Sequence, residues 1–154
     1  MRIALTVFLG LSLMVAGLRP AAAAPPDPSG YWVTGKGEGV VQIYSCGPNT
    51  LCGALVGFQI DHPTDPTPQT WDHRSQCRFV FIRDLHPRTR AWMGSIINPQ
   101  SGHGYSAKVR LLSADQLRLR GYFLLPMLGA TRFWSRYTGP TPPADCRMPP
   151  HSLE

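Results

Sequence analysis

Charged residues are scarce in this sequence. Asp, Glu, Lys and Arg make up 16% of its 154 residues, well below the roughly 25% of an average soluble domain. This scarcity excludes long charged helices, coiled coils and acidic disordered tails. After residue 24 the sequence has no apolar stretch long enough to span a bilayer, and it carries no nucleotide-binding glycine loop and no serine-hydrolase or zinc-protease signature.

Glycine and proline, by contrast, are abundant, with 15 and 16 copies. Hydrophobic residues make up 43% of the chain, which is too many for a disordered protein. The length supports one ordinary domain. This balance favours many short strands joined by glycine and proline turns.

The first 24 residues have the order of a secretory signal peptide. Arg2 is followed by a nearly unbroken apolar run over 3–18 and by four alanines at 21–24. The run is short for a membrane anchor. We therefore expect residues 1–23 to be a cleaved signal peptide, with the cut after Ala22 or Ala23, followed by a Pro-rich leader over 24–29. The mature protein should be periplasmic or secreted, and not membrane-spanning.

Lys and Arg outnumber Asp and Glu by 15 to 9, but the arginines are spread along the chain. Without a dense run or a known nucleic-acid motif, they are expected on solvated strand faces, with no nucleic acid bound. A contact with an anionic surface or an envelope protein stays open. The candidates for a basic patch on one wall are Arg78, Arg110, Arg118 and Arg120.

The four cysteines, Cys46, Cys52, Cys77 and Cys146, all lie in the predicted mature part. An even count in an exported chain favours two disulfides among three possible pairings. A turn sequence separates Cys46 from Cys52, which favours that pair and leaves Cys77 with Cys146. The second bridge would tether the Pro-rich tail over 140–154. A zinc site is the rival interpretation, but the paired spacing of zinc ligands is missing.

Strand-like runs alternate with turn signals over 30–139, the predicted domain. In the run 116–123, Leu117 and Leu119 alternate with Arg118 and Arg120. This alternation, with a period of two residues, is typical of a β-strand. A long polar loop covers 60–76, a turn covers 84–88, and a short helical turn is expected over 124–130. The expected strands are 31–34, 39–44, 53–58, 77–82, 91–97, 105–112, 116–123 and 131–138.

These runs predict an all-β protein of about eight antiparallel strands. Short connections favour antiparallel neighbours, and eight such strands close into an up-and-down barrel without exposed edges. A barrel of this size is either filled by side chains or holds one small ligand. A two-sheet sandwich is the alternative.

Gly30-x-Trp32 in the first strand and Trp134-x-Arg136 in the last resemble the signature of lipocalin-like barrels. That resemblance implies that Trp32 plugs the barrel base and that Arg136 packs across its ring in a cation–π contact. Most of the mature chain also resembles an uncharacterised bacterial exported family, domain of unknown function 2147. The matching stretches include Val41-x-Ile43-Tyr44-x-Cys46, Leu51-Cys52-Gly53, Trp92-x-Gly94-x-Ile96, Asn98-Pro99-x-x-Gly102-x-x-Tyr105 and Leu117-x-x-Arg120-Gly121-Tyr122. The family implies a lipocalin-like barrel in the bacterial envelope or outside the cell, and it supplies no catalytic site.

One cluster of polar residues could carry chemistry. It comprises Asp61, His62, Asp65, Asp72 and His73 in the long loop, with His86 and His103 on other loops. A metal site or an acid–base pair of a hydrolase would use these residues. Three prolines break any regular ligand spacing, however, and solvated turn residues are the favoured interpretation. We expect no metal, no cofactor and no enzyme activity.

Aromatic residues on separate strands are the candidate binding residues. If they point inward, they line a small pocket for a hydrophobic or amphipathic molecule, which the protein would transport or sequester. A packed core is the competing interpretation, and an envelope interaction or inhibitor protein acting through its Arg-rich surface is the alternative function. The candidates are Tyr44, Phe79, Phe81, Trp92, Tyr105 and Tyr122.

Overall fold

The computed structural model describes residues 23–153, and these residues form an all-β structure. No stretch of this part of the chain is a helix that could cross a membrane. The predicted signal peptide lies outside the described residues, except for Ala23. The strands are β1 (Gly30–Val33), β2 (Gly39–Gly47), β3 (Thr50–Gln59), β4 (Val80–Arg88), β5 (Ala91–Ile97), β6 (Gly104–Ser113), β7 (Gln116–Tyr122), β8 (Gly129–Arg136) and β9 (Arg147–Met148).

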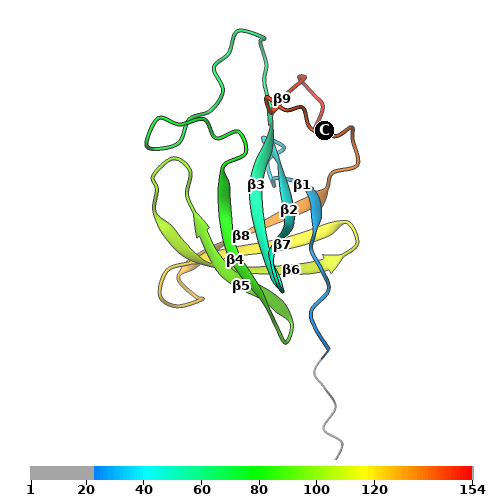
Figure 1. The fold of residues 1–154 in the computed structure, drawn as a ribbon, viewed down its shortest axis with the longest axis vertical. Helices are drawn as coiled ribbons and strands as arrows, with labels where there is room; N and C mark the ends of the chain where they lie inside the picture. Colours follow the sequence, from blue (N-terminus) through cyan, green and yellow to red (C-terminus); the bar gives the residue numbers. More distant parts are fainter. Residues whose placement is uncertain (1–22, 154) are drawn as a thin grey trace, which may run out of the picture.

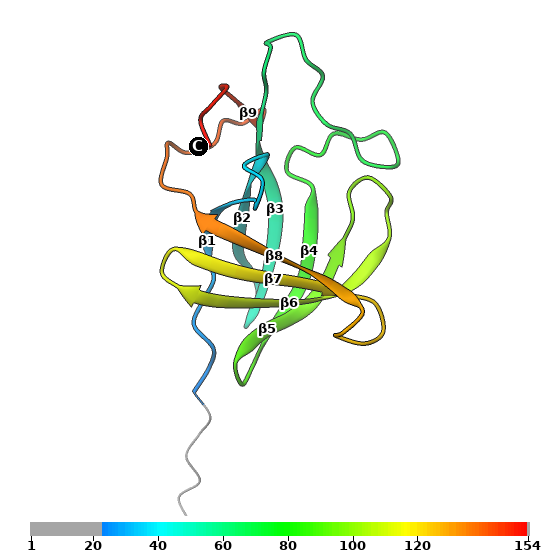
Figure 2. The same cartoon turned by 180° about the vertical axis from the view of Figure 1, so that it is seen from behind.

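Eight of these strands close into an antiparallel up-and-down barrel (Figures 1 and 2). Each strand from β1 to β8 pairs with the next, and β8 returns to β1 through the register Trp32 to Arg136 and Val33 to Ser135. The predicted barrel is therefore confirmed. The ninth strand, β9, was not expected. It comes from the Pro-rich tail and runs parallel to β3 at Phe58 and Gln59.

The barrel has two different ends because the strands alternate in direction. The tight hairpins after β2, β4 and β6 lie at one end together with the leader before β1. The other end carries the connections over 34–38, 60–79, 98–103 and 123–128. We call the first the closed end and the second the mouth.

The interior of the barrel is packed toward the closed end. Trp32, Val109 and Leu117 have no exposed surface there and belong to one continuous core. The alternation expected in β7 holds, since Leu117 and Leu119 are buried whereas Arg118 and Arg120 lie on the outer face. Burial of such side chains contributes about 1.5–3 kcal/mol each.

Both predicted disulfides are present. Cys46 is bonded to Cys52 across the β2–β3 hairpin, and Cys77 to Cys146. The second bridge joins the end of the long loop to the tail. A small outer core forms beside it, where Met148 packs with Val40 and Val56 on the outside of β2 and β3.

The predicted turn over 84–88 is wrong. β4 continues to Arg88, and the register shifts between Arg83 and His86. Asp84 has a φ of 54° at this bulge. An extra residue in one strand breaks the period of two, which is why the sequence pattern seemed to stop there. The strand also begins later than expected, at Val80 instead of Cys77.

The predicted helical turn over 124–130 is also wrong. The chain makes a tight loop closed by hydrogen bonds from the Phe123 amide to the Leu128 carbonyl (3.0 Å) and from the Leu128 amide to the Leu125 carbonyl (2.9 Å). Leu124 has a φ of 59°, which no right-handed helix contains, and Pro126 has no amide hydrogen to donate.

Candidate functional site

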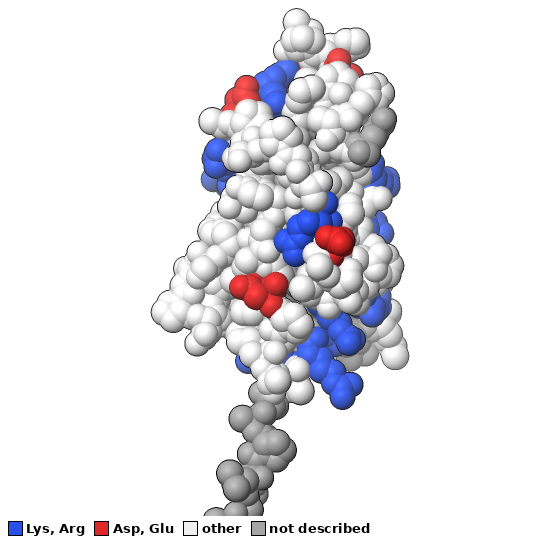
Figure 3. Space-filling view, turned by 90° about the vertical axis from the view of Figure 1, so that its right-hand side faces the viewer, with Lys and Arg blue, Asp and Glu red and all other residues white. Residues whose placement is uncertain are grey.

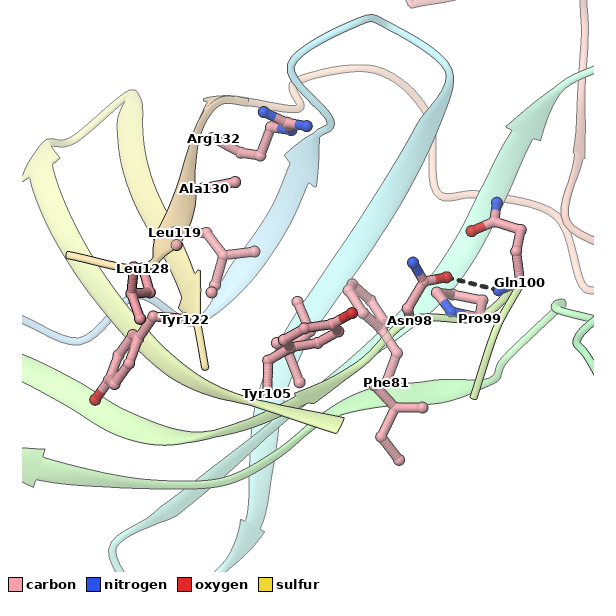
Figure 4. Close-up of a pocket in the computed structure, with 14 residues that line it drawn as sticks. Phe81, Asn98, Pro99, Gln100, Tyr105, Leu119, Tyr122, Leu128, Ala130 and Arg132 are labelled. Carbon is pink, nitrogen blue, oxygen red and sulfur yellow. Dashed lines mark hydrogen bonds between the residues drawn. The ribbon is translucent and has the colours of Figure 1, made fainter. Parts of the chain in front are cut away.

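A cavity of about 420 Å³ opens at the mouth of the barrel (Figure 4). It lies between β5 and β6 on one side and β7 and β8 on the other. Cavities that bind small ligands commonly range from about 300 to 1,000 Å³. The lining residues are Phe81, Ile96, Ile97, Asn98, Pro99, Gln100, Tyr105, Leu119, Gly121, Tyr122, Leu128, Gly129, Ala130 and Arg132.

Strand register explains which side chains reach this cavity. Ile96 pairs with Tyr105 across β5 and β6, and Leu119 pairs with Arg132 across β7 and β8. Directly opposed residues share a face of the sheet, so Arg132 points to the same side as buried Leu119. Gly121 pairs with Ala130 one step nearer the mouth. Because these two residues are small, the interior stays open at this level, whereas larger side chains fill it deeper in the barrel.

Arg132 is the one charged residue among those that line the cavity. In Figure 4 its side chain lies across from Asn98 and Tyr105. Its guanidinium makes only a 3.4 Å hydrogen bond to the carbonyl of Thr131, and no described carboxylate forms an ion pair with it. The cavity therefore combines apolar walls with one positive charge at the rim.

The turn over 98–103 forms the opposite rim. The side-chain oxygen of Asn98 accepts hydrogen bonds from the amides of Gln100 (2.8 Å, Figure 4) and Ser101 (3.3 Å). Such a turn is a typical role of Asn, whose side chain mimics a backbone carbonyl. The backbone amide of Asn98 donates to the carbonyl of His103 (2.9 Å), and the side-chain nitrogen Nδ2 makes none of these bonds, which leaves it as a donor at the rim.

The long loop over 60–79 braces this rim from outside. Trp71 lies against Gly102, where any side chain would collide with the indole. Gly102 also has a φ of 73°, so a glycine is needed there for two reasons. The amide of Trp71 donates to the carbonyl of Pro99 (2.9 Å). Rim and long loop are thus one connected unit.

The predicted binding aromatics fall into two groups. Phe81, Tyr105 and Tyr122 line the mouth cavity, although the Tyr122 ring points away from its centre in Figure 4. The other three do not reach it. Phe79 packs edge-on against Trp71, with ring centroids 5.9 Å apart, and Tyr44 packs on the outer core.

Trp92 lies at the closed end instead. Its indole nitrogen donates to the carbonyl of Pro26 in the leader (3.0 Å). Arg132 and the rim residues Asn98 and Gln100 were not among the candidates. The signal for Arg132 was in the sequence, because it lies two residues before Trp134 in a strand and so shares the inward face of that residue.

The polar cluster of the long loop does not assemble. Among residues 23–153, no three His, Cys, Asp or Glu side chains gather as metal ligands would. Asp72 is engaged locally, since it accepts a hydrogen bond from the Thr70 hydroxyl (2.5 Å) and pairs with Arg74 (2.7 Å). The hydrogen bond from Thr70 and the charge of Arg74 lower the pKa of Asp72 below its ordinary value of 3.8.

Three of the four arginines proposed for a basic patch come together. Arg110 pairs with Arg118 across β6 and β7, and Arg120 is two residues further along. Lys108, opposite Arg120, completes the group. Arg78 is excluded, because its amide bonds to Leu55 on β3, on another part of the wall. Lys and Arg side chains also gather low on the face shown in Figure 3.

The closed end has the lipocalin-like arrangement that the resemblance implied. The guanidinium of Arg136 lies 3.8 Å from the centroid of the Trp32 ring, and it donates to the carbonyls of Ser29 and Ala114, both at 3.0 Å. The Trp32 indole donates to the carbonyl of Pro28 (2.9 Å).

A closed eight-stranded barrel, sealed at one end and hollow at the other, defines the class of lipocalin-like barrel proteins. The chain matches the model of a family described as an uncharacterized protein conserved in bacteria, DUF2147, over residues 30–136. It therefore belongs to that family. No curated protein and no solved structure matches it.

Proposed function

We propose that the mouth cavity binds a small amphipathic molecule with an anionic head, and that the protein transports or sequesters this molecule without catalysis. Its place of action would be the periplasm or the outside of the cell. Two disulfides and membership of a bacterial family support an exported protein. The ligand's apolar part would lie on Phe81, Ile96 and Leu119.

The observation that carries this proposal is the charge pattern of the lining. Arg132 is cationic, no Asp or Glu lines the cavity, and most of the remaining wall is apolar. An apolar ligand without a head group would need no cation at the rim. An anionic head would accept hydrogen bonds from Arg132 and from the side-chain amide of Asn98, while the ligand's tail displaces water from the apolar wall.

Filling the cavity tests the site. Titration with the fluorescent amphipathic anion 1-anilinonaphthalene-8-sulfonate should give saturable binding to the native protein. Gly121→Leu and Ala130→Phe should weaken this binding at least tenfold, because both side chains would enter the cavity. Gly121 has room, since an added Cβ would lie 3.5 Å from Ile96. Ser135→Phe, on the outer face of β8, is the matched control and should bind normally.

Decanoate and decanol test the head group. They share a chain and differ in charge, so competition against the dye compares them directly. Arg132→Gln should weaken decanoate about three- to tenfold and leave decanol unchanged. Equal weakening of both would contradict the anionic preference. Unchanged dye binding in both filled variants would remove the mouth cavity as the site and favour an interaction protein that acts through its surface.

A further inference from the structure

The β7–β8 connection is an exposed apolar loop. Proteins that stay monomeric in water seldom present so many large apolar side chains together. No other described residue covers them. The exposed fractions are 57% for Phe123, 77% for Leu124, 54% for Leu125, 79% for Met127 and 58% for Leu128.

This loop has a defined shape. Backbone hydrogen bonds close it between Phe123 and Leu128 (3.0 Å). Arg120 holds it from the barrel, because its guanidinium donates to the carbonyl of Pro126 (2.8 Å from Nε) and to the hydroxyl of Thr131 (2.7 Å). The apolar side chains are thus presented outward on a braced support.

A cationic group lies directly behind the loop, on the outer face of β6 and β7. Lys108 faces Arg120, and Arg110 faces Arg118, in adjacent cross-strand pairs. Like charges in such positions repel each other. The strands β6, β7 and β8 contain no Asp or Glu, and none of the four cations forms an ion pair with a described residue. Figure 2 shows these strands crossing the front of the barrel, with the loop at their end.

We propose that this surface, the 123–128 loop with Lys108, Arg110, Arg118 and Arg120, docks on an anionic lipid bilayer. Leu124 and Met127 would enter the acyl boundary, since they are the most exposed apolar side chains. Strand geometry places Arg118 roughly 17 Å from Phe123, five residues away at about 3.3 Å per residue, whereas the guanidinium of Arg120 contacts the loop itself. A loop that inserts by roughly 5–10 Å would therefore bring these cations to the lipid headgroups.

The apolar loop and the cationic group together favour an anionic bilayer over a nucleic acid or another polyanion as the partner. A nucleic acid or an acidic glycan would engage the cations but would leave aliphatic side chains such as Leu124 and Met127 in water. Nucleic-acid surfaces rely on aromatic stacking platforms, whereas the two exposed rings here, Phe123 and Phe133, are outnumbered by the exposed non-aromatic side chains at 124, 125, 127 and 128. A bilayer with anionic headgroups satisfies charge and apolar area together.

Docking would also orient the mouth cavity. Leu128 belongs to the loop and lines the cavity, so the opening would lie at the lipid surface. This orientation gives a route between the bilayer and the cavity, and that part of the inference rests on the proposed function. The docking itself does not.

Flotation with lipid vesicles tests the docking. The purified protein should float with vesicles of phosphatidylcholine containing 30% phosphatidylglycerol, and far less with phosphatidylcholine alone. The double variant Leu124→Asp with Met127→Asp should bind roughly thirtyfold more weakly. Arg110→Gln with Arg118→Gln should lose roughly tenfold or more. All proteins compared carry the same N-terminus, so the differences report on this surface.

The matched control removes two cations at the closed end, Arg88→Gln with Arg90→Gln, and should float normally. Equal loss in this control, or normal flotation of the Leu124 and Met127 variant, would overturn the proposal. Circular dichroism checks that each variant is folded. Dye binding separates the two proposals. The variant with Leu124→Asp and Met127→Asp should still bind the dye, and Ala130→Phe should still float with the vesicles.

Discussion

The guanidinium of Arg136 lies 3.8 Å from the centroid of the Trp32 indole, at the point where the last strand of the barrel meets the first. Both residues also bind the leader, Arg136 through the carbonyl of Ser29 and Trp32 through that of Pro28. One contact therefore closes the sheet, covers the core and positions the N-terminal segment.

Removal of this guanidinium should destabilise the barrel. Arg136→Ala loses the ring contact and two charged hydrogen bonds, and we expect a cost of about 2–3 kcal/mol. Arg132→Ala is the matched control on the same strand, with no ring beneath it, and should cost less than about 0.5 kcal/mol. Urea unfolding followed by tryptophan fluorescence measures both. Similar losses for the two variants would show that the contact is unimportant.

Gly30 is needed for the same closure. Its φ of 126° disfavours any side chain, and a Cβ there would collide with the Arg136 guanidinium. Gly30→Ala should therefore cost about 1–3 kcal/mol. Gly104→Ala, where an added Cβ meets nothing within 4 Å, should be nearly neutral. The same urea experiment compares them, and a neutral Gly30→Ala would contradict the close packing at this end.

The two disulfides should contribute unequally. They span 69 and 6 residues, and chain entropy alone predicts about 4.4 and about 2.4 kcal/mol. Replacing Cys77 and Cys146 by alanine should thus lower the free energy of unfolding more than replacing Cys46 and Cys52. The first change should also speed proteolysis within 60–79. A larger loss from the short hairpin bridge would contradict this ranking.

The turn over 70–74 should respond to acid. Because the folded pKa of Asp72 lies below 3.8, its carboxylate stabilises the fold above that pH, and the contribution disappears as the pH falls through the folded pKa. An NMR titration of the Asp72 carboxyl should give a midpoint below 3.8. Thr70→Val should raise that midpoint, since it removes the principal hydrogen bond. A native midpoint at or above 3.8 would contradict the contact.

Period-two patterns predicted the barrel because each strand has one wet and one dry face. These patterns gave wrong predictions where a strand or loop does not follow this alternation of buried and exposed faces. The bulge at Asp84 breaks the alternation in β4, so the second half of that strand was predicted as a turn. The apolar residues of the 123–128 loop were interpreted as a helical turn that would bury them, but in the structure they are exposed. Arg132 was not predicted as a binding residue for a related reason. It points inward at a mouth that stays open to water, so polarity there no longer marks the outer face.

The binding of an anionic amphiphile in the mouth cavity can be measured residue by residue. An amide NMR titration with decanoate should give saturable shifts concentrated at Tyr105, Leu119, Ala130 and Arg132, and these shifts should vanish in Ala130→Phe. Saturable shifts confined to other residues, or no shifts at millimolar decanoate, would contradict the proposed site.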